Sequence, residues 1–146
     1  MLIALGALAD YASVTSDQKL VIAGVFDALV VGGLPAVHPS MALAVRLIGD
    51  PGQTGTHDIG VRLVDPDGHE LVPPFASKLA LASDDPSERG VSQFVLRLDN
   101  LTFKMAGRHS FDVLADGEYI GSVELRVRVQ PSAAADAPGE AAKPDA

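Results

Sequence analysis

Histidine is the side chain that most readily moves protons near neutral pH, and the chain has four, His38, His57, His69 and His109. No two lie at the spacing of a zinc site built on one strand or one helical turn. His38 and His57 lie in or near predicted loops, where they could meet in space. A small hydrolase with one of these two as its base is therefore a hypothesis that the sequence leaves open.

Aspartates in the predicted loops suggest a second chemistry, the binding of calcium. Asp65-Pro66-Asp67-Gly68 begins like a calcium-binding loop, but Pro66 interrupts it and the ligand series stops there. A turn with Gly68 at a positive φ explains all four residues. The further loop acids are Asp50, Asp84, Asp85, Asp99 and Asp116. A C2-like module, in which loops at one end of a sandwich share a calcium ion, is thus an alternative, although solvated turns are the commoner use of such residues.

Other reaction centres lack their required residues. The chain has no cysteine, which excludes disulfides, thiolate metal sites and a cysteine nucleophile. It contains no Gly-x-Ser-x-Gly elbow, and Gly32-Gly33 lacks the lysine and hydroxyl of a phosphate-binding loop. We therefore predict a non-enzymatic protein with no catalytic residue, no cofactor and no metal.

The net charge and the lack of a long apolar run argue against two classes of partner, nucleic acids and membranes. With 11 lysines and arginines against 19 aspartates and glutamates, the net charge is −8, which repels a phosphate backbone, so we predict no nucleic-acid partner. No apolar run approaches the roughly 20 residues needed to cross a bilayer, so we predict no membrane partner. Residues 2–9 superficially resemble a signal peptide but follow no lysine or arginine, and we expect a buried first strand and a cytoplasmic protein.

A hairpin over residues 107–129 is the most clearly patterned element. Apolar residues alternate with polar ones on both sides of Asp116-Gly117, which is typical of half-buried strands. Phe111 and Val123 share a face only if the loop has an odd number of residues or the hairpin contains a bulge, because a plain two-residue turn would place Phe111 opposite Ser122. We predict one of these two irregularities.

Further strands are predicted from apolar alternation and turn residues. They cover residues 2–14, 19–27, 41–47, 59–63, 70–72, 75–82 and 94–98. Residues 19–27 are apolar on both faces, which indicates a central strand or one lying against another element. Ala28 to Pro39 is predicted to be irregular because of its glycines and prolines. The whole pattern predicts an all-β fold, a two-sheet antiparallel β-sandwich of immunoglobulin-like general architecture, with about eight strands and little helix.

Residues 1–130 are predicted to form this single β-sandwich domain. From Pro131 onward the composition changes to mainly alanine, proline, aspartate, glycine and lysine. We expect residues 131–146 to be a disordered acidic tail, because they contain too little apolar surface to join a core.

One corner of the predicted sandwich is more specific. Five residues follow the spacing of the corner found in immunoglobulin-like sandwiches, where a tyrosine enters a late strand and bonds back to the preceding loop. They are Leu101, Phe103, Gly107, His109 and Phe111. His109 stands in the place of that tyrosine. Its imidazole could donate a similar hydrogen bond, so we expect His109 to pack against or cap this corner.

Three segments resemble a family of short bacterial proteins of unknown function. They are Ala9-Asp10-Tyr11, then Lys19-Leu20 with Ile22, Gly24, Phe26 and Asp27, and then Pro35-Ala36-Val37-His38-Pro39. Residues 107–129 match the closing hairpin of that family apart from His109, which departs from its glycine–aromatic pattern. The resemblance covers about the first 130 positions. It implies a bacterial domain with a β-sandwich-like pattern and brings no activity or catalytic residue with it.

The candidate partner surface lies between residues 29 and 38, where apolar side chains occur in a stretch whose burial is not assured. Its members are Leu29, Val30, Val31, Leu34, Val37 and His38. Sandwiches use exposed strand edges and irregular loops to recognise partners. We therefore predict a binding or assembly module whose partner is another protein or a second copy of the chain. The alternative is that these side chains cover one open end of the core.

Overall fold

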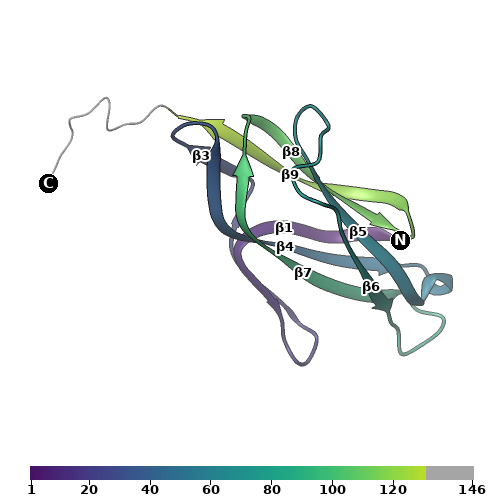
Figure 1. Cartoon of the computed structure of the whole chain (residues 1–146). Helices are drawn as coiled ribbons and strands as arrows, with labels where there is room; N and C mark the ends of the chain where they lie inside the picture. The colour runs from purple at the N-terminus through teal and green to yellow at the C-terminus, as the bar shows by residue number, and fades with distance from the viewer. Residues whose placement is uncertain (131–146) are drawn as a thin grey trace, which may run out of the picture.

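The computed structural model describes residues 1–130, which form nine strands and one short 3-10 helix (Figure 1). The strands are β1 (Leu2–Val14), β2 (Leu20–Phe26), β3 (Ala28–Val31), β4 (Ala36–Gly49), β5 (Gly55–Val64), β6 (Phe75–Leu81), β7 (Gly90–Phe103), β8 (Gly107–Ala115) and β9 (Glu118–Val129). The helix η1 (Pro51–Gln53) joins β4 to β5. Over these residues no helix is long and apolar enough to cross a membrane. The predicted tail, residues 131–146, lies outside the described residues.

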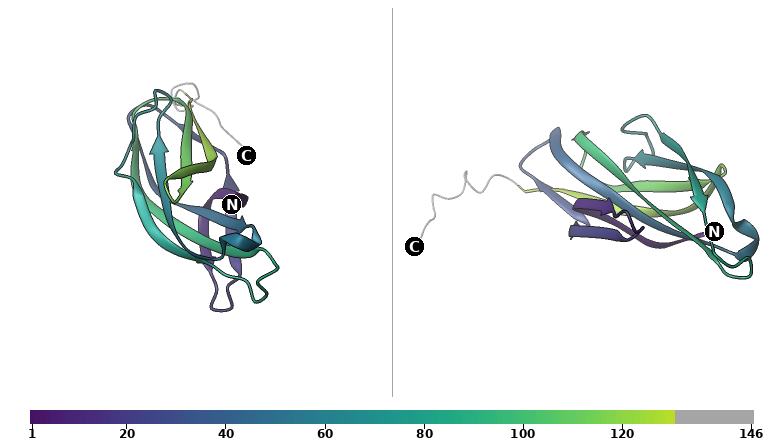
Figure 2. Two further views of the ribbon diagram at one scale, coloured as in Figure 1. Left: turned by 90° about the vertical axis from the view of Figure 1, so that its right-hand side faces the viewer. Right: turned by 90° about the horizontal axis from the view of Figure 1, so that it is seen from below.

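The strands form two sheets that lie face to face as a sandwich (Figure 1, Figure 2). One sheet has the order β2-β1-β4-β7 and the other the order β3-β9-β8-β5-β6. Paired strands run antiparallel except β3 and β9, which are parallel. Asp27 alone separates β2 from β3, so the chain passes directly from the edge of one sheet to the edge of the other. The predicted all-β, two-sheet sandwich is confirmed.

The core lies between the sheets and uses every second residue of the strands, as their pleat requires. On β4 the inward residues are at most 1% exposed, and they are Met41, Leu43, Val45 and Leu47. The facing sheet contributes buried residues from β5, β8 and β9, namely Ile59, Val61, Leu63, Phe111, Val113, Leu125 and Val127. Because both layers supply large apolar side chains, burial of this surface is the main favourable contribution to folding.

β4 is buried on its other face as well. Ala42 and Ala44 alternate with the core residues, yet they are only 3% and 0% exposed. The β1–β2 hairpin reaches over this face. Gln93 of β7, which pairs with Arg46 of β4, donates a side-chain hydrogen bond to the backbone carbonyl of Gln18 in the hairpin turn. Alanine suits these positions since its small side chain leaves room for the hairpin to lie close to the sheet.

The β8–β9 hairpin has a bulge, which is one of the two irregularities predicted for it. Asp116 and Gly117 form its turn with φ of 52° and 83°, the two positive values of a type I′ turn. The register then shifts by one residue, and Ile120 is the extra residue on β9. Phe111 consequently pairs with Val123, so the apolar residues of both strands share the core face.

The stretch from Ala28 to Pro39 is mostly regular, so the irregular loop predicted there is wrong. It contains β3 and the start of β4, with only residues 32–35 forming a bend between them. Pro39 does not interrupt β4, because β1 pairs with β4 only from Ala42 onward and no neighbour on that side needs an N–H from the proline. Asn100, which lies opposite Pro39 on β7, has a positive φ of 53° at the same irregular point.

Two smaller expectations are also corrected. β2 forms an edge of its sheet, so the prediction of a central strand is wrong. The alternative prediction, a strand lying against another element, fits the position of the β1–β2 hairpin over β4. The predicted return strand at residues 70–72 is reduced to a single bridge between Val64 and Glu70. Pro73 and Pro74 follow directly and cannot donate to a longer ladder.

Replacing Phe111 by alanine is expected to lower the free energy of unfolding by about 3–5 kcal/mol, because this fully buried ring would leave a cavity between the sheets. Phe75→Ala is the matched control, since the Phe75 ring is 41% exposed at the start of β6. The control should cost about 1 kcal/mol. Urea unfolding followed by circular dichroism measures both, and equal losses would contradict the assignment of Phe111 to the core.

Candidate functional site

His38 and His57, which the sequence predicted in or near loops, belong to strands β4 and β5 and lie at opposite ends of the sandwich. His38 belongs to the first residues of β4, whereas His57 on β5 contacts Gln53 of η1, just after the last residue of β4. The extended strand between His38 and Gly49 spans roughly 35 Å. A site that combines His38 and His57 is therefore ruled out.

His57 is the centre of a polar cluster at the η1 end of the molecule. Its Nδ1 lies 2.6 Å from Asp116 Oδ2, and its Nε2 lies 2.5 Å from the carbonyl oxygen of Gln53. Both partners are acceptors, so both ring nitrogens must donate, and only the imidazolium form can do this. The hydrogen bond to Asp116, followed by the one to the Gln53 carbonyl, raises the pKa of His57 above its ordinary value of 6.5.

The cluster extends from Asp116 to β5 and β6. Asp116 Oδ1 accepts a hydrogen bond from the Asp58 amide at 2.9 Å, and Lys78 Nζ donates to Asp58 Oδ1 at 2.6 Å. The hydrogen bond from His57 is the largest cause that holds the pKa of Asp116 below 3.8. The network fastens the β8–β9 turn to two neighbouring strands. It also leaves His57 without a lone pair for a substrate proton, so the geometry does not present this residue as a general base.

His109 occupies the corner that the sequence predicts for it. The residue is fully buried, its Nδ1 lies 3.2 Å from the carbonyl oxygen of Gly107, and its ring meets Phe103 edge-on with centroids 5.2 Å apart. Burial lowers the pKa of His109 below 6.5, so the neutral ring donates from Nδ1. His38 likewise packs beside an aromatic ring, 6.0 Å from the centroid of Phe26. Both histidines therefore act in packing.

Asp65 serves a turn, as the sequence predicts. Its Oδ1 accepts hydrogen bonds from the amides of Asp67 and His69 at 2.8 and 2.9 Å, and Gly68 has a φ of 88°. These bonds hold the pKa of Asp65 below 3.8, with the amide of His69 as the largest cause. Over residues 1–130 no group of three or more histidines and carboxylates could hold a metal ion. The calcium alternative therefore receives no support from the placement of these acids.

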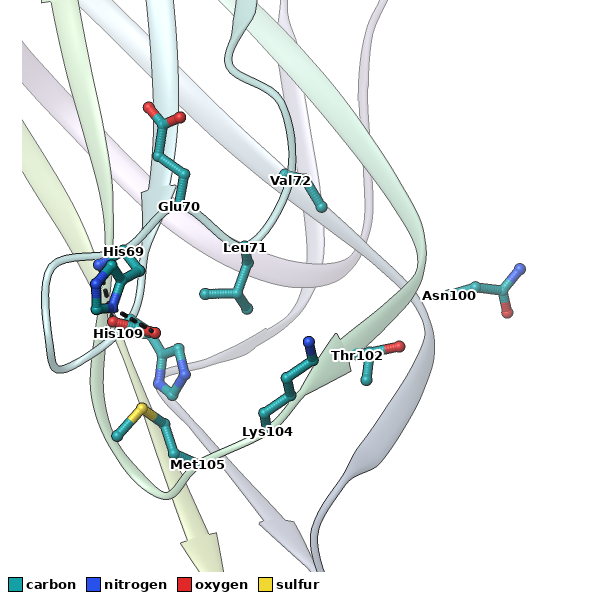
Figure 3. A pocket seen from close by; sticks show the side chains of 10 residues that line it. His69, Glu70, Leu71, Val72, Asn100, Thr102, Lys104, Met105 and His109 are labelled. Atoms are coloured by element: carbon teal, nitrogen blue, oxygen red, sulfur yellow. Dashed lines mark hydrogen bonds and ion pairs between the residues drawn. The ribbon is translucent and has the colours of Figure 1, made fainter.

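A hollow of about 480 Å³ lies over the buried His109 (Figure 3). Its lining combines Leu71 and Met105 with Lys104, whereas the carboxylate of Glu70 points away from it (Figure 3). His109 is 0% exposed, so its ring supports the floor and presents no group to a ligand. The lining also includes Asp65, His69 and Thr102, so the hollow combines charged and polar groups with apolar walls.

The structure divides the predicted partner surface into two sets. Val30, Leu34 and Val37 are exposed, at 58%, 38% and 60%. Leu29 and Val31 pack against the core, because they alternate with Val30 along β3 and so face the opposite side. His38 is half-buried. Val30, Leu34 and Val37 are thus accessible on the surface, whereas Leu29 and Val31 cover the core, as the alternative prediction had it.

Sequence reasoning missed a second set of exposed apolar residues on the β1–β2 hairpin. Val25 is 65% exposed, Tyr11 51% and Val21 42%. Tyr11 pairs with Ala23, which lies between Val21 and Val25 on the edge strand β2. An edge strand without charges has the same sequence pattern as a buried central strand, so no signal in the sequence separated the two.

The family of unknown function DUF6941 matches residues 4–128 of the chain. The chain belongs to this family. None of the curated proteins matches this DUF6941 member. Membership agrees with the resemblance seen in the sequence and brings no established activity with it.

Two solved structures are similar to parts of this DUF6941 protein. The Pseudomonas fluorescens alkylpurine DNA glycosylase AlkC bound to DNA containing an abasic site analog is 20% identical, with a TM-score of 0.39, over 70% of this chain and 27% of that chain. The beta-glucosidase from Listeria innocua in complex with isofagomine is 15% identical, with a TM-score of 0.45, over 87% of this chain and 16% of that chain. The chain thus spans 27% and 16% of the two proteins, and likenesses this weak carry no argument about function.

Replacing His57 by glutamine is expected to destabilise the protein more at pH 6 than at pH 9. The pKa of His57 is raised in the folded state, so its contribution is fully present below 6.5 and is lost as the pH rises through the raised value. His69→Gln is the matched control, since the His69 side chain is 81% exposed. Melting temperatures across this range measure the effect, and a pH-independent difference between wild type and His57→Gln would contradict the imidazolium assignment.

Proposed function

We propose that this DUF6941 protein is a non-enzymatic module that binds a protein partner along the side formed by β2 and β3. The observation that carries the proposal is that two consecutive edge strands on this side contain no charged residue. β2 pairs only with β1, and β3 pairs only with β9, so each strand has one side with no paired neighbour. Such edges present backbone N–H and C=O groups to an incoming strand.

The opposite side of the sandwich provides a comparison within the same molecule. Its edge strands carry charges, with Lys78 on β6 and Arg97 and Asp99 on β7. A bridge between Ala82 and Val91 also links these two edges. Charges on an edge strand discourage pairing with other chains. The contrast favours β2 and β3 as the side on which pairing is permitted.

Exposed apolar side chains accompany the uncharged edges. Val25 on β2 and Val30 on β3 are 65% and 58% exposed, and Leu34 and Val37 follow just after β3. In strand addition, backbone hydrogen bonds supply affinity, and alternate side chains supply specificity. The exposed valines would provide the apolar part of that contact.

Lysine substitutions at Val25 and Val30 test this proposal. Both side chains are exposed, so Val25→Lys and Val30→Lys should each change the unfolding free energy by less than about 0.5 kcal/mol. Each should reduce capture of the partner from the native host, because a lysine on an edge strand opposes pairing. Ala80→Lys on the exposed face of β6 is the control and should leave capture unchanged.

The measurement is crosslinking and affinity capture with the full chain, together with light scattering of the purified protein. Light scattering distinguishes a second copy of the chain from a different protein. If the captured proteins and the oligomeric state are the same for wild type, Val25→Lys and Val30→Lys, then the β2–β3 side is not the binding surface.

A further inference from the structure

Three arginines gather on the outer face of the five-stranded sheet. Arg108 of β8 and Arg126 of β9 are direct cross-strand partners, and Arg128 lies two residues further along β9 on the same face. All three residues are exposed. They form a local positive cluster on a chain whose net charge is −8.

This arrangement is unfavourable for the isolated domain. Like charges directly opposite one another on neighbouring strands destabilise a sheet. Glu124 Oε1 lies 3.6 Å from Arg108 Nε, and Asp27 lines the same small hollow. Arg126 and Arg128 form no ion pair with any residue of the described part of the chain. Among residues 1–130, the cluster therefore combines three arginines with the two carboxylates of Asp27 and Glu124 and retains an excess of positive charge.

The cluster lies beside the open edge of β3. Arg126 pairs with Ala28 and Arg128 pairs with Val30, and these residues point to the outer face. A strand added beyond β3 would lie about 4.8 Å from Ala28 and about 9.6 Å from Arg126. Because Ala28 ends at its methyl group, the Arg126 side chain can extend across it to the added strand.

Building on the proposed function, we propose that the partner supplies an extended segment with carboxylates at every second residue, which adds to the edge of β3. Carboxylates on the outer side of that segment would align with Ala28 and Val30 and pair with Arg126 and Arg128. The alternate residues of the segment would turn inward. Charge complementarity would then offset the repulsion between Arg108 and Arg126 and would fix the register of the added strand.

Two other occupants fit this surface less well. A second copy of the chain would bring one of its edge strands, β2, β3, β6 or β7. Among these strands the one carboxylate is Asp99 of β7, which already lies 3.4 Å from Arg97, so no edge strand carries alternating carboxylates. A nucleic-acid backbone has no amide N–H and C=O groups, so it cannot form the strand pairing that the open edge of β3 offers. Each of these occupants corresponds to a distinct outcome of the test.

Fluorescence anisotropy with a labelled peptide of alternating glutamate and threonine tests the proposal on the full chain. A peptide with glutamine in place of glutamate is the neutral control. The glutamate peptide should bind about fivefold more tightly than the glutamine peptide, which is the effect expected of two exposed ion pairs. The preference should disappear as the ionic strength rises from about 0.01 M to about 1 M.

Arg126→Gln combined with Arg128→Gln should abolish this preference without unfolding the protein, since both side chains are exposed. Arg89→Gln, in the exposed loop before β7, is the matched control and should retain it. Equal binding of the two peptides to wild type would overturn the acidic-segment inference while leaving strand addition in place. If neither peptide binds, the inference is also wrong. The proposed function is tested separately by the capture experiment with Val25→Lys and Val30→Lys.

A duplex oligonucleotide that binds more tightly than the glutamate peptide, with the same dependence on Arg126 and Arg128, would overturn the proposal in favour of a nucleic-acid surface. Self-association that requires these two arginines would overturn it in favour of a second copy. Binding of the glutamate peptide that survives the double substitution would place the acidic segment elsewhere on the molecule and would likewise contradict the proposal.

Discussion

The burial of β4 on both faces is the constraint on which the rest of this structure depends. Large side chains such as Leu43 and Val45 face the second sheet, and the alanines between them face the β1–β2 hairpin. Since side chains alternate strictly along a strand, a slip of one residue would exchange these two sets. The slip would place alanines in the main core and turn leucine and valine to the face that Ala42 and Ala44 occupy. The order of large and small residues in β4 therefore fixes both layers at once.

The bulge in the β8–β9 hairpin sets which residues of the two strands face the core, and the turn beside it contributes a charged contact. It brings Phe111 opposite Val123 while keeping a tight turn at Asp116 and Gly117. Aspartate tolerates the left-handed conformation that this turn needs. Its carboxylate is then held beside His57 and the Asp58 amide, so one residue both shapes the turn and anchors it to β5. Packing and polar contacts at this end of the sandwich thus have a common origin.

What could be predicted from the sequence was mostly local. The positions of Phe111 and Val123 around Asp116-Gly117 predicted either an odd-length loop or a bulge, and the structure has the bulge. Tolerance of Pro39 within β4 could not be predicted, because it depends on where β1 stops pairing with that strand. The edge position of β2 depends likewise on the order of strands that are distant in sequence. The contact between His57 and Asp116 joins residues 59 positions apart, and neither residue has a local pattern that indicates the other.

The two perturbed histidines have opposite effects on how the fold responds to acid and base. The pKa of His57 is raised, so the imidazolium loses its stabilising bonds as the solution becomes alkaline above 6.5. The pKa of His109 is lowered, so the unfolded chain takes up a proton more readily below 6.5, and acid favours unfolding through this residue. Together, these groups favour a stability optimum near the ordinary histidine pKa, with a different end of the sandwich weakened on each side of it. Acid would act first at the buried corner of β8, and alkali at the turn that joins β8 to β9.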